Sequence, residues 1–458
     1  MIRSLRDGMR TLTWRAVLGV TGGTLRELAQ LQRWERLAPA ESAAVARRRL
    51  SGMLEQAWRE VPFWRSALAN AGVVDRGGTA DPTALTRLPL LDKVTLRDQL
   101  PRLIAGAEGR GAYWNTSGGS TGEPARFRQD ASYRDAVRAA AMLFNTWAAY
   151  EQGQEMVKIW GSERDLFDGG ESLRTRVVRW LRGEVWLNAF RMTPAQMHEH
   201  LATINRLRPG FILGYVESVY DLARVADAAG IPMHPPRAVM TSAGPLEPPV
   251  RALVSKVFGA PVFNRYGSRE VGDVACDCAA GTGLHVITPY HHVEIVRPDG
   301  APCAVGEVGE VVLTLLTNRT MPLIRYRIGD LAAWAAGECA CGRAWPRLAS
   351  VAGRVSDVFI RPDGTRIHGE YFTHLFYFLD WVGKFQVEQH TPSHLTVHIV
   401  PNCRSEDPAR EHVEAIAEVV AKIRLVMGAS CQVDLAFTES IPPTASGKFR
   451  YTISHVTA

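Results

Sequence analysis

The chain has 458 residues, of which 46% are hydrophobic and 22% charged, and its formal net charge is +6. This composition is typical of a folded globular protein with a sizeable core. No apolar run reaches the roughly 18 residues of a membrane-spanning helix, and no block of like charges resembles a nucleic-acid-binding tail. The first residues lack the apolar core of a signal peptide. We therefore expect a cytoplasmic protein that does not bind nucleic acid.

The N-terminal part predicts packing rather than chemistry. Apolar residues at helical spacing predict two or three helices over residues 24–74. Residues 13–25 are apolar enough for a helix that lies on a surface, but Gly19, Gly22 and Gly23 weaken this pattern. Contact with a membrane is therefore not expected.

Residues 114–124 form the most distinctive stretch, with three glycines and four hydroxyl side chains. They are Gly118, Gly119 and Gly122, and Thr116, Ser117, Ser120 and Thr121. Backbone N–H groups and hydroxyls in such a stretch can converge on phosphate oxygens. It is not a Walker-type loop, because Glu123-Pro124 follows instead of a Lys-Ser/Thr pair. The alternating run 125–129 predicts a strand, so the loop is predicted to join a hairpin. A Ser/Gly linker is the alternative.

Helical and strand-like segments alternate from residue 131 to 258, which predicts a mainly parallel sheet with helices on its faces. The predicted helices are 131–150, 194–207, 217–229 and 248–258, and the predicted strands are 156–160, 185–190, 211–215 and 238–242. Ligands bind such sheets at the carboxyl ends of the strands. The expected substrate pocket therefore includes Trp160, Tyr215, Ser242, Ala243 and Gly244.

The pattern becomes β-rich over residues 284–335, and it changes again near Gly353-Arg354. Beyond that point come about a hundred residues of mixed α and β, the size of a small domain. We expect an α/β fold with a large N-terminal domain over 1–353, which includes a β-rich subdomain, and a small α+β domain over 354–458.

Four of the seven cysteines lie in two pairs, Cys276 with Cys278 and Cys339 with Cys341. Cys278, Cys339 and Cys341 together with His285 offer three sulfurs and one imidazole, a set suited to tetrahedral Zn²⁺. Cys276 competes with Cys278 for the first position, and reduced core thiols are the alternative. Four protein ligands leave no open position, so a zinc ion here would be structural.

Six segments resemble, in their order, the core motifs of the adenylate-forming superfamily of acyl-CoA ligases, adenylation domains and luciferases. They are the 114–124 loop, Ser242-Ala243-Gly244-Pro245, Asn264-Arg265-Tyr266-Gly267-Ser268-Arg269-Glu270, Tyr326-Arg327-Ile328-Gly329-Asp330, Gly353-Arg354-Val355-Ser356-Asp357 and Ser446-Gly447-Lys448. The resemblance covers about residues 40–455. It points to the phenylacetate-CoA-ligase-like branch and, within it, to the CapK-like group.

The resemblance implies an ATP site. The loop from residue 116 to 122 would bind the β- and γ-phosphates, Tyr266 would lie along the adenine, and Ser268 would reach the α-phosphate. Glu270 would hold Mg²⁺, since two oxyanions meet at the α-phosphorus and their charge must be neutralised. Asp330 and Arg354 would face the ribose, and Asn264, Arg265 and Gly267 complete the motif. Some relatives also carry zinc at the place of the cysteine pairs, within about residues 276–345.

The resemblance further implies a mobile C-terminal domain whose Lys448 enters the site during adenylation and withdraws afterwards. Many relatives carry Asp at the hinge, where this chain has Ser356 with Asp357 after it. The expected substrates are a carboxylic acid and ATP, with CoA as the acyl acceptor. An amine, a hydroxyl or a carrier-protein thiol is the alternative acceptor, and a non-catalytic nucleotide-binding scaffold is the alternative class. The sequence leaves the acid and the oligomeric state open, a homodimer included.

Overall fold

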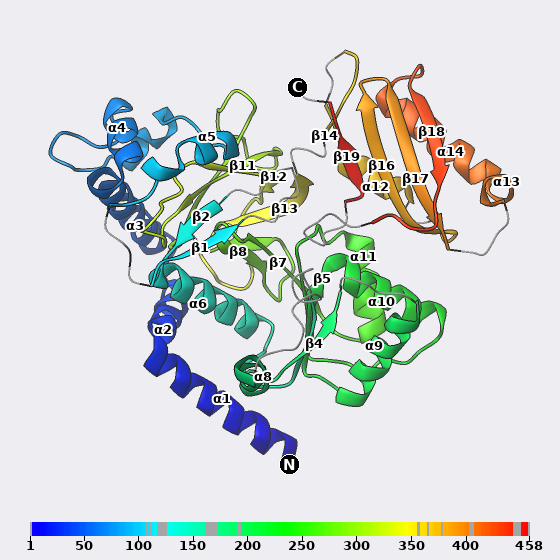
Figure 1. Ribbon diagram of the computed structural model, residues 1–458, viewed down its shortest axis with the longest axis horizontal. Helices are drawn as coiled ribbons and strands as arrows, with labels where there is room; N and C mark the ends of the chain where they lie inside the picture. Colours follow the sequence, from blue (N-terminus) through cyan, green and yellow to red (C-terminus); the bar gives the residue numbers. More distant parts are fainter. Residues whose placement is uncertain are drawn as a thin grey trace. The chain divides into compact units, whose positions relative to one another are not determined.

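The computed structural model describes residues 2–106, 109, 111–116, 126–160, 173–189, 194–354, 358–363, 366–376, 379–402, 407–442 and 450–456. The chain divides into two compact units (Figure 1). The first comprises Met1–Ile328 with Ala332–Val351, and the second comprises Gly329–Leu331 with Ala352–Ala458. Among the described residues no helix is long and apolar enough to cross a membrane.

The first unit begins with four helices. They are α1 (Ile2–Thr21), α2 (Thr24–Trp34), α3 (Pro39–Glu60) and α4 (Pro62–Asn70). Gly22 and Gly23 separate α1 from α2, where Asp135 accepts hydrogen bonds from the Gly23 N–H and the Thr24 hydroxyl at 2.7 and 2.8 Å. A Cβ on Gly22 would lie 2.7 Å from the Asp135 carboxylate, so the close approach requires glycine.

Three short helical segments follow and lead to the first hairpin. They are η1 (Pro82–Arg87), α5 (Lys93–Asp98) and η2 (Leu100–Arg102), and the hairpin strands are β1 (Tyr113–Thr116) and β2 (Arg126–Gln129). The two strands pair antiparallel, with Thr116 opposite Arg126. The predicted hairpin is confirmed, because the residues on either side of the loop are direct partners in the ladder.

An eleven-stranded sheet forms the body of the first unit, with strand order β10-β11-β12-β13-β9-β8-β7-β6-β5-β3-β4. Its parallel part consists of β3 (Met156–Trp160), β4 (Glu184–Asn188), β5 (Phe211–Tyr215), β6 (Ala238–Ser242) and β7 (Val262–Ser268). The helices among these strands are α6 (Ala131–Trp147), α8 (Leu173–Leu181), α9 (Pro194–Leu207), α10 (Val216–Ala228) and α11 (Pro248–Phe258). The predicted βα alternation is confirmed.

The β-rich segment extends this sheet with strands that run antiparallel from β7 onward. They are β8 (Gly272–Asp277), β9 (Leu284–Val286), β10 (His291–Val296), β11 (Gly309–Leu315), β12 (Tyr326–Trp334) and β13 (Arg347–Arg354). The strands predicted after residue 284 are present. They continue the parallel sheet rather than forming a sheet of their own, because β8 pairs with β7.

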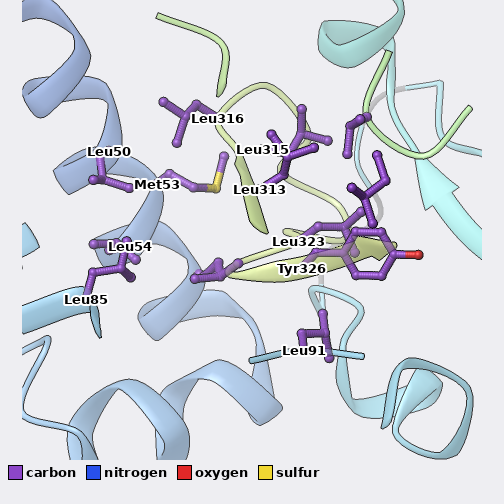
Figure 2. Close-up of a cluster of buried hydrophobic side chains, with 14 of the residues drawn as sticks. Leu50, Met53, Leu54, Leu85, Leu91, Leu313, Leu315, Leu316, Leu323 and Tyr326 are labelled. Carbon is purple, nitrogen blue, oxygen red and sulfur yellow. The ribbon is translucent and has the colours of Figure 1, made fainter. Parts of the chain in front are cut away.

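Two apolar clusters hold the first unit together. In one, Leu50, Met53 and Leu54 of α3 pack against Leu313 and Leu315 of β11, as Figure 2 shows. In the other, α2 and α6 cover the parallel strands through buried leucine, phenylalanine and methionine side chains. Full burial of one such side chain contributes about 2 kcal/mol to the free energy of unfolding. Because α2 and α3 supply several of these side chains, the N-terminal helices are part of the core.

The second unit contains the hairpin β14 (Val358–Ile360) and β15 (Arg366–His368), and a four-stranded sheet of order β18-β17-β16-β19. The strands of this sheet are β16 (Val382–Thr391), β17 (His394–Pro401), β18 (Gln432–Phe437) and β19 (Thr452–Ser454), and its helices are α12 (Gly369–Phe376), α13 (Pro408–Glu411) and α14 (Val413–Met427). Phe372, Val397 and Ile423 share its apolar core. A small α+β fold results.

Candidate functional site

The residues predicted to bind a nucleotide lie on several elements, and hydrogen bonds connect two of these elements. Gln129 at the end of β2 donates to the Arg269 carbonyl at 2.8 Å and accepts from the Asn115 amide of β1 at 3.1 Å. Tyr133 of α6 also donates to the Arg269 carbonyl, at 3.2 Å. The base of the hairpin is therefore bonded to the turn that joins β7 to β8, and Thr116 follows Asn115 at the loop end of β1. Residues 117–122 of the predicted loop lie outside the described residues.

The turn between β7 and β8 carries Ser268 and Glu270. The β7–β8 register shifts between Tyr266 and Gly267, and a Cβ on Gly267 would lie 2.2 Å from the Gly272 carbonyl oxygen. Glycine is thus required where the strands approach most closely. The Ser268 hydroxyl is buried and has no hydrogen-bond partner in the described part of the chain. Glu270 is buried as well.

The neighbouring residues of β7 are firmly fixed. The Asn264 N–H donates to the Asp277 carboxylate at 2.9 Å, and its side-chain oxygen accepts from Thr241 at 3.2 Å. Arg265 lies 3.5 Å from the Asp273 carboxylate. Tyr266 lies within the apolar cluster. This strand therefore presents a rigid backbone to whatever binds at its carboxyl end.

The remaining predicted nucleotide-binding residues belong to the second unit. Asp330 lies in β12, directly after Gly329 with its positive φ of 86°. Arg354 is the last residue of the adjacent strand β13, and its side chain lies outside the described residues, as do Lys448, Ser356 and Asp357. The second unit thus contains the residues predicted to face the ribose and the predicted adenylation lysine.

The predicted substrate-pocket residues form one row across the ends of parallel strands. Tyr215 pairs with Ser242, and Ser242 pairs with Arg265 on the next strand. The rings of Trp160 and Tyr215 lie 4.1 Å apart at 34°. Ala243 has a positive φ of 66°, and a Cβ on Gly244 would lie 3.2 Å from Val216. The structure brings all five predicted residues to the same edge of the sheet.

Lys158 lies one step back from this row, and the sequence did not single it out. Its Nζ is 4.2 Å from the centroid of the Trp186 ring and 5.2 Å from that of Trp160. Burial lowers the pKa of Lys158 to about 8; the carboxylate of Glu184 opposes this shift and the charge of Arg265 adds to it. A lysine in a strand is an ordinary polar position in the alternating pattern. The only signal in the sequence that Lys158 has aromatic neighbours was the aromatic residue two positions later.

The four residues predicted to bind zinc lie together in the first unit. One ligand atom from each of Cys278, His285, Cys339 and Cys341 lies within 4.8 Å of all the others. The Cys278 and Cys339 sulfurs are 3.5 Å apart, and the Cys341 sulfur is 3.2 Å from His285 Nε2. Cys276 is the ladder partner of His285 but packs in the apolar cluster and is not part of this group. Cys278 is therefore the cysteine of the first pair that joins the group.

Contacts around the four-residue cluster orient it for a cation. His285 Nδ1 donates to the Trp345 carbonyl at 2.9 Å, which leaves Nε2 with a lone pair that faces the sulfurs. Burial alone would raise the pKa of the Cys339 thiol, but hydrogen bonds with Thr282, the Cys341 backbone and His285 lower it to about 6. Burial and the neighbouring thiols raise the pKa of Cys278 to about 11. A bound cation would favour all three thiolates, so the donor set fits Zn²⁺.

Comparisons with known proteins agree with this geometry. Residues 359–455 match the family described as the CapK C-terminal domain. The chain is 29% identical to the phenylacetate-coenzyme A ligase of Thermus thermophilus, over 71% of this chain and 73% of that protein. It is 22% identical to Protein CapK of Staphylococcus aureus, over 81% of this chain and 80% of that protein.

The fold is also that of a solved ligase. The crystal structure of 2-hydroxyisobutyryl-CoA ligase in the postadenylation state superposes with a TM-score of 0.71 at 21% identity, covering 92% of this chain and 91% of that chain. The fold is therefore the one found in adenylate-forming ligases. In sequence the chain is similar to phenylacetate-CoA ligases and to Protein CapK, and the CapK family match lies in residues 359–455.

Proposed function

We propose that the chain is an ATP-dependent, AMP-forming ligase, which activates a carboxylic acid as an acyl-adenylate and then transfers the acyl group, with CoA as the favoured acceptor. Its relation to phenylacetate-CoA ligases supports this proposal. The observation that carries it is the pair of Gln129 hydrogen bonds, which connect Asn115, the residue before Thr116, to the Arg269 carbonyl in the turn that also contains Glu270.

In this proposal the loop from Thr116 to Gly122 binds the β- and γ-phosphates through backbone N–H groups and hydroxyls. The Ser268 hydroxyl, buried and without a partner among the described residues, donates to the α-phosphate. Glu270 holds Mg²⁺, which neutralises charge on the phosphates during the transfer. A buried hydroxyl without a partner costs stability, so the Ser268 hydroxyl fits a site that is completed by a ligand.

Further residues are proposed to bind the adenine and the ribose of ATP. Asn264 and Gly267 frame the adenine beside Tyr266, and Arg265 supports the same strand through Asp273. Asp330 accepts hydrogen bonds from both ribose hydroxyls, and Arg354 faces the same sugar. A carboxylate suits this task because its two oxygens accept from two adjacent hydroxyls.

The proposed reaction proceeds in two steps. First, a carboxylate oxygen of the acid attacks the α-phosphorus, the bond to the β-phosphate breaks, and pyrophosphate leaves. Lys448 stabilises the charge that gathers between the carboxylate and the α-phosphate. Second, the acceptor thiolate attacks the acyl carbonyl and AMP leaves. Residues 354–458 act as a small domain that moves Lys448 away between the two steps, while residues 1–353 keep the nucleotide and the acyl group.

The acyl group occupies the row formed by Trp160, Tyr215 and Ser242 together with Ala243 and Gly244. The adjacent rings of Trp160 and Tyr215 favour an aromatic or apolar acyl group. An amine, a hydroxyl or a carrier-protein thiol is the second candidate acceptor, because Ser356 stands where many relatives carry a hinge aspartate.

We also propose that Cys278, His285, Cys339 and Cys341 hold one structural Zn²⁺. The donor atoms are mutually close, and the four ligands fill a tetrahedron. Such an ion carries no open position for a substrate. It would stabilise the connection between β9, the segment before β13, and the end of β8.

The test is to supply a panel of carboxylic acids with ATP and Mg²⁺ and to measure pyrophosphate and AMP with and without CoA. We expect acid-dependent pyrophosphate release and, for the right acid, a CoA thioester that mass spectrometry detects. Unchanged turnover and products on addition of CoA would eliminate the thioester step and favour the second acceptor. Tight ATP binding without pyrophosphate release for any acid would favour a non-catalytic nucleotide-binding protein.

A further inference from the structure

Helix α1 has apolar side chains on two opposite faces. Trp14 and Leu18 are buried and fix the helix to the first unit. On the other face, Leu5, Met9, Leu12 and Val20 are between 62% and 89% exposed. At 100° per residue these four positions fall within an arc of about 80°, so they form one continuous stripe along the helix. We call it the α1 stripe.

Helix α8 carries a second exposed stripe. Leu173, Val177 and Trp180 follow each other at intervals of four and three residues and are between 48% and 74% exposed. Val178 and Leu181 on the other side pack against the apolar cluster of the first unit. We call the three exposed residues the α8 stripe. A monomeric protein rarely exposes so many large apolar side chains on two of its helices.

The two helices lie next to each other, as Figure 1 shows near the N-terminus. The Arg10 guanidinium of α1 lies 5.1 Å from the centre of the Trp180 ring of α8. Trp180 of the α8 stripe therefore lies beside α1, and the two stripes belong to adjacent helices of the first unit.

The two helices carry more basic than acidic residues, although Arg10 is buried and Arg6 pairs with Glu155 at 2.9 Å. Helix α1 contains four arginines and one aspartate, and α8 contains three arginines and no acidic residue. Arg174 and Arg176 of α8 are exposed and form no ion pair within the described part of the chain. Arg15 of α1 is exposed and pairs with Glu151 at 3.2 Å. Arginines at the margins of apolar stripes match an anionic surface with an apolar interior.

We propose that the surface formed by the α1 and α8 stripes docks on an anionic phospholipid membrane. The stripes would enter the boundary between headgroups and acyl chains, Trp180 would lie at the interface, and the arginines would contact lipid phosphates. A second copy of the chain fits less well, because a symmetric contact would bring the same arginine-rich helices together. No described helix crosses a membrane, so the association would be peripheral.

The sequence alone indicated an apolar surface helix only over residues 13–25, and the glycines there weakened that pattern. The helix begins at Ile2 and ends at Thr21, so the stripe starts at Leu5. Gly22 and Gly23 lie after the helix and do not interrupt it. Gly19 lies on the exposed face and leaves the stripe continuous.

The test is sedimentation of the full chain with vesicles of phosphatidylcholine alone and with vesicles that also contain phosphatidylglycerol. We expect binding to the anionic vesicles, weaker binding at high salt, and little binding to phosphatidylcholine alone. The variant Leu5→Ser/Met9→Ser/Leu12→Ser should lower the affinity at least about tenfold, because it removes most of the α1 stripe. Leu173→Ser/Val177→Ser should lower it by a smaller factor.

The matched control is Val305→Ser/Val413→Ser/Leu425→Ser, which removes three exposed apolar side chains elsewhere. It should bind vesicles like the unchanged protein, and circular dichroism should show all variants folded. No binding of the unchanged protein to anionic vesicles would overturn the proposal, as would equal losses in the α1 variant and the control. A dimer that the α1 variant dissociates, without vesicle binding, would assign the surface to a second copy and overturn it as well.

Discussion

Two sites lie at the two ends of β8, and they differ in whether their polar atoms have partners within the described part of the chain. At its end lies Cys278, whose sulfur is 3.5 Å from that of Cys339, and the imidazole of His285 nearby is held by the Trp345 carbonyl. At its start lies the turn with Ser268, whose buried hydroxyl has no partner among the described residues. In the proposed function, the cluster supplies all the ligands of a cation, whereas the hydroxyl at the turn pairs with a ligand that has acceptor atoms.

This difference assigns different tasks to the two ends. A closed set of donors contributes to folding, since no position remains for a substrate. A buried polar group that the fold leaves unsatisfied costs stability and is retained where a substrate pairs with it. Changes at the cluster should therefore reduce stability first, and changes at the turn should reduce catalysis first.

The largest effect is expected at the cluster. Cys339→Ser removes a ligand, so the protein should lose its zinc and about 3 kcal/mol or more of its free energy of unfolding. Metal analysis and denaturant unfolding measure both quantities. Cys276→Ser, in the apolar cluster nearby, should keep the zinc. Protein that is free of zinc and as stable as the zinc-loaded form would show that the cluster is a set of ordinary thiols.

The next effect concerns Lys448. Lys448→Ala should slow acyl-adenylate formation about a hundredfold or more, because it removes a cation that stabilises charge in the transition state. Transfer from a presynthesised acyl-adenylate to the acceptor should stay nearly unchanged, as should the stability. Lys422→Ala, on the exposed face of α14, is the control and should leave both steps intact. Equal loss of both steps in folded Lys448→Ala would contradict the domain rotation.

A smaller effect is expected for Ser268→Ala. Adenylation should fall about tenfold through the loss of one hydrogen bond to phosphate, while the stability stays equal or rises slightly because an unpaired buried hydroxyl disappears. Ser255→Ala is the matched control, since its hydroxyl donates to the Ala260 carbonyl at 2.9 Å. It should lose about 1 kcal/mol of stability and keep its rate. Loss of stability in Ser268→Ala would mean that the hydroxyl serves the fold.

The smallest effect is expected at Lys158, which lies close to the predicted substrate-pocket residues. The folded protein lowers the pKa of Lys158 from 10.5 to about 8, so its charged form costs free energy below pH 8. Lys158→Met should raise the free energy of unfolding at pH 7 by about 1 kcal/mol, after allowance for partial contact with solvent. The unfolded state binds the additional proton between pH 8 and 10.5, so the unchanged protein gains stability over that range and the advantage of the variant fades.

Chemical denaturation of both proteins at several pH values checks this prediction. Lys256→Met is the control, because that lysine is exposed and paired with Asp227 at 2.8 Å. It should show no gain at pH 7. A gain in Lys158→Met that stays constant up to pH 10.5 would assign the effect to packing with Trp186 instead of charge.

Periodicity and composition in the sequence sufficed for the order of the elements. The strands 156–160, 211–215 and 238–242 and the helices 194–207 and 248–258 have the predicted bounds, because buried parallel strands are short apolar runs between amphipathic helices. The hairpin around the glycine-rich loop followed from the alternation after Pro124.

The tertiary structure decided which distant residues meet. Cys276 and Cys278 are equivalent in the sequence. In the structure Cys276 is the residue of β8 opposite His285 but packs in the apolar cluster, whereas Cys278, directly after β8, joins His285 and the other two cysteines. Likewise, Gln129 gives no local signal that it joins the hairpin to the turn after β7. The sequence determined the local elements and the chemical groups, because these depend on neighbours along the chain. Strand pairing and packing determined the sites, because they depend on contacts across more than a hundred residues.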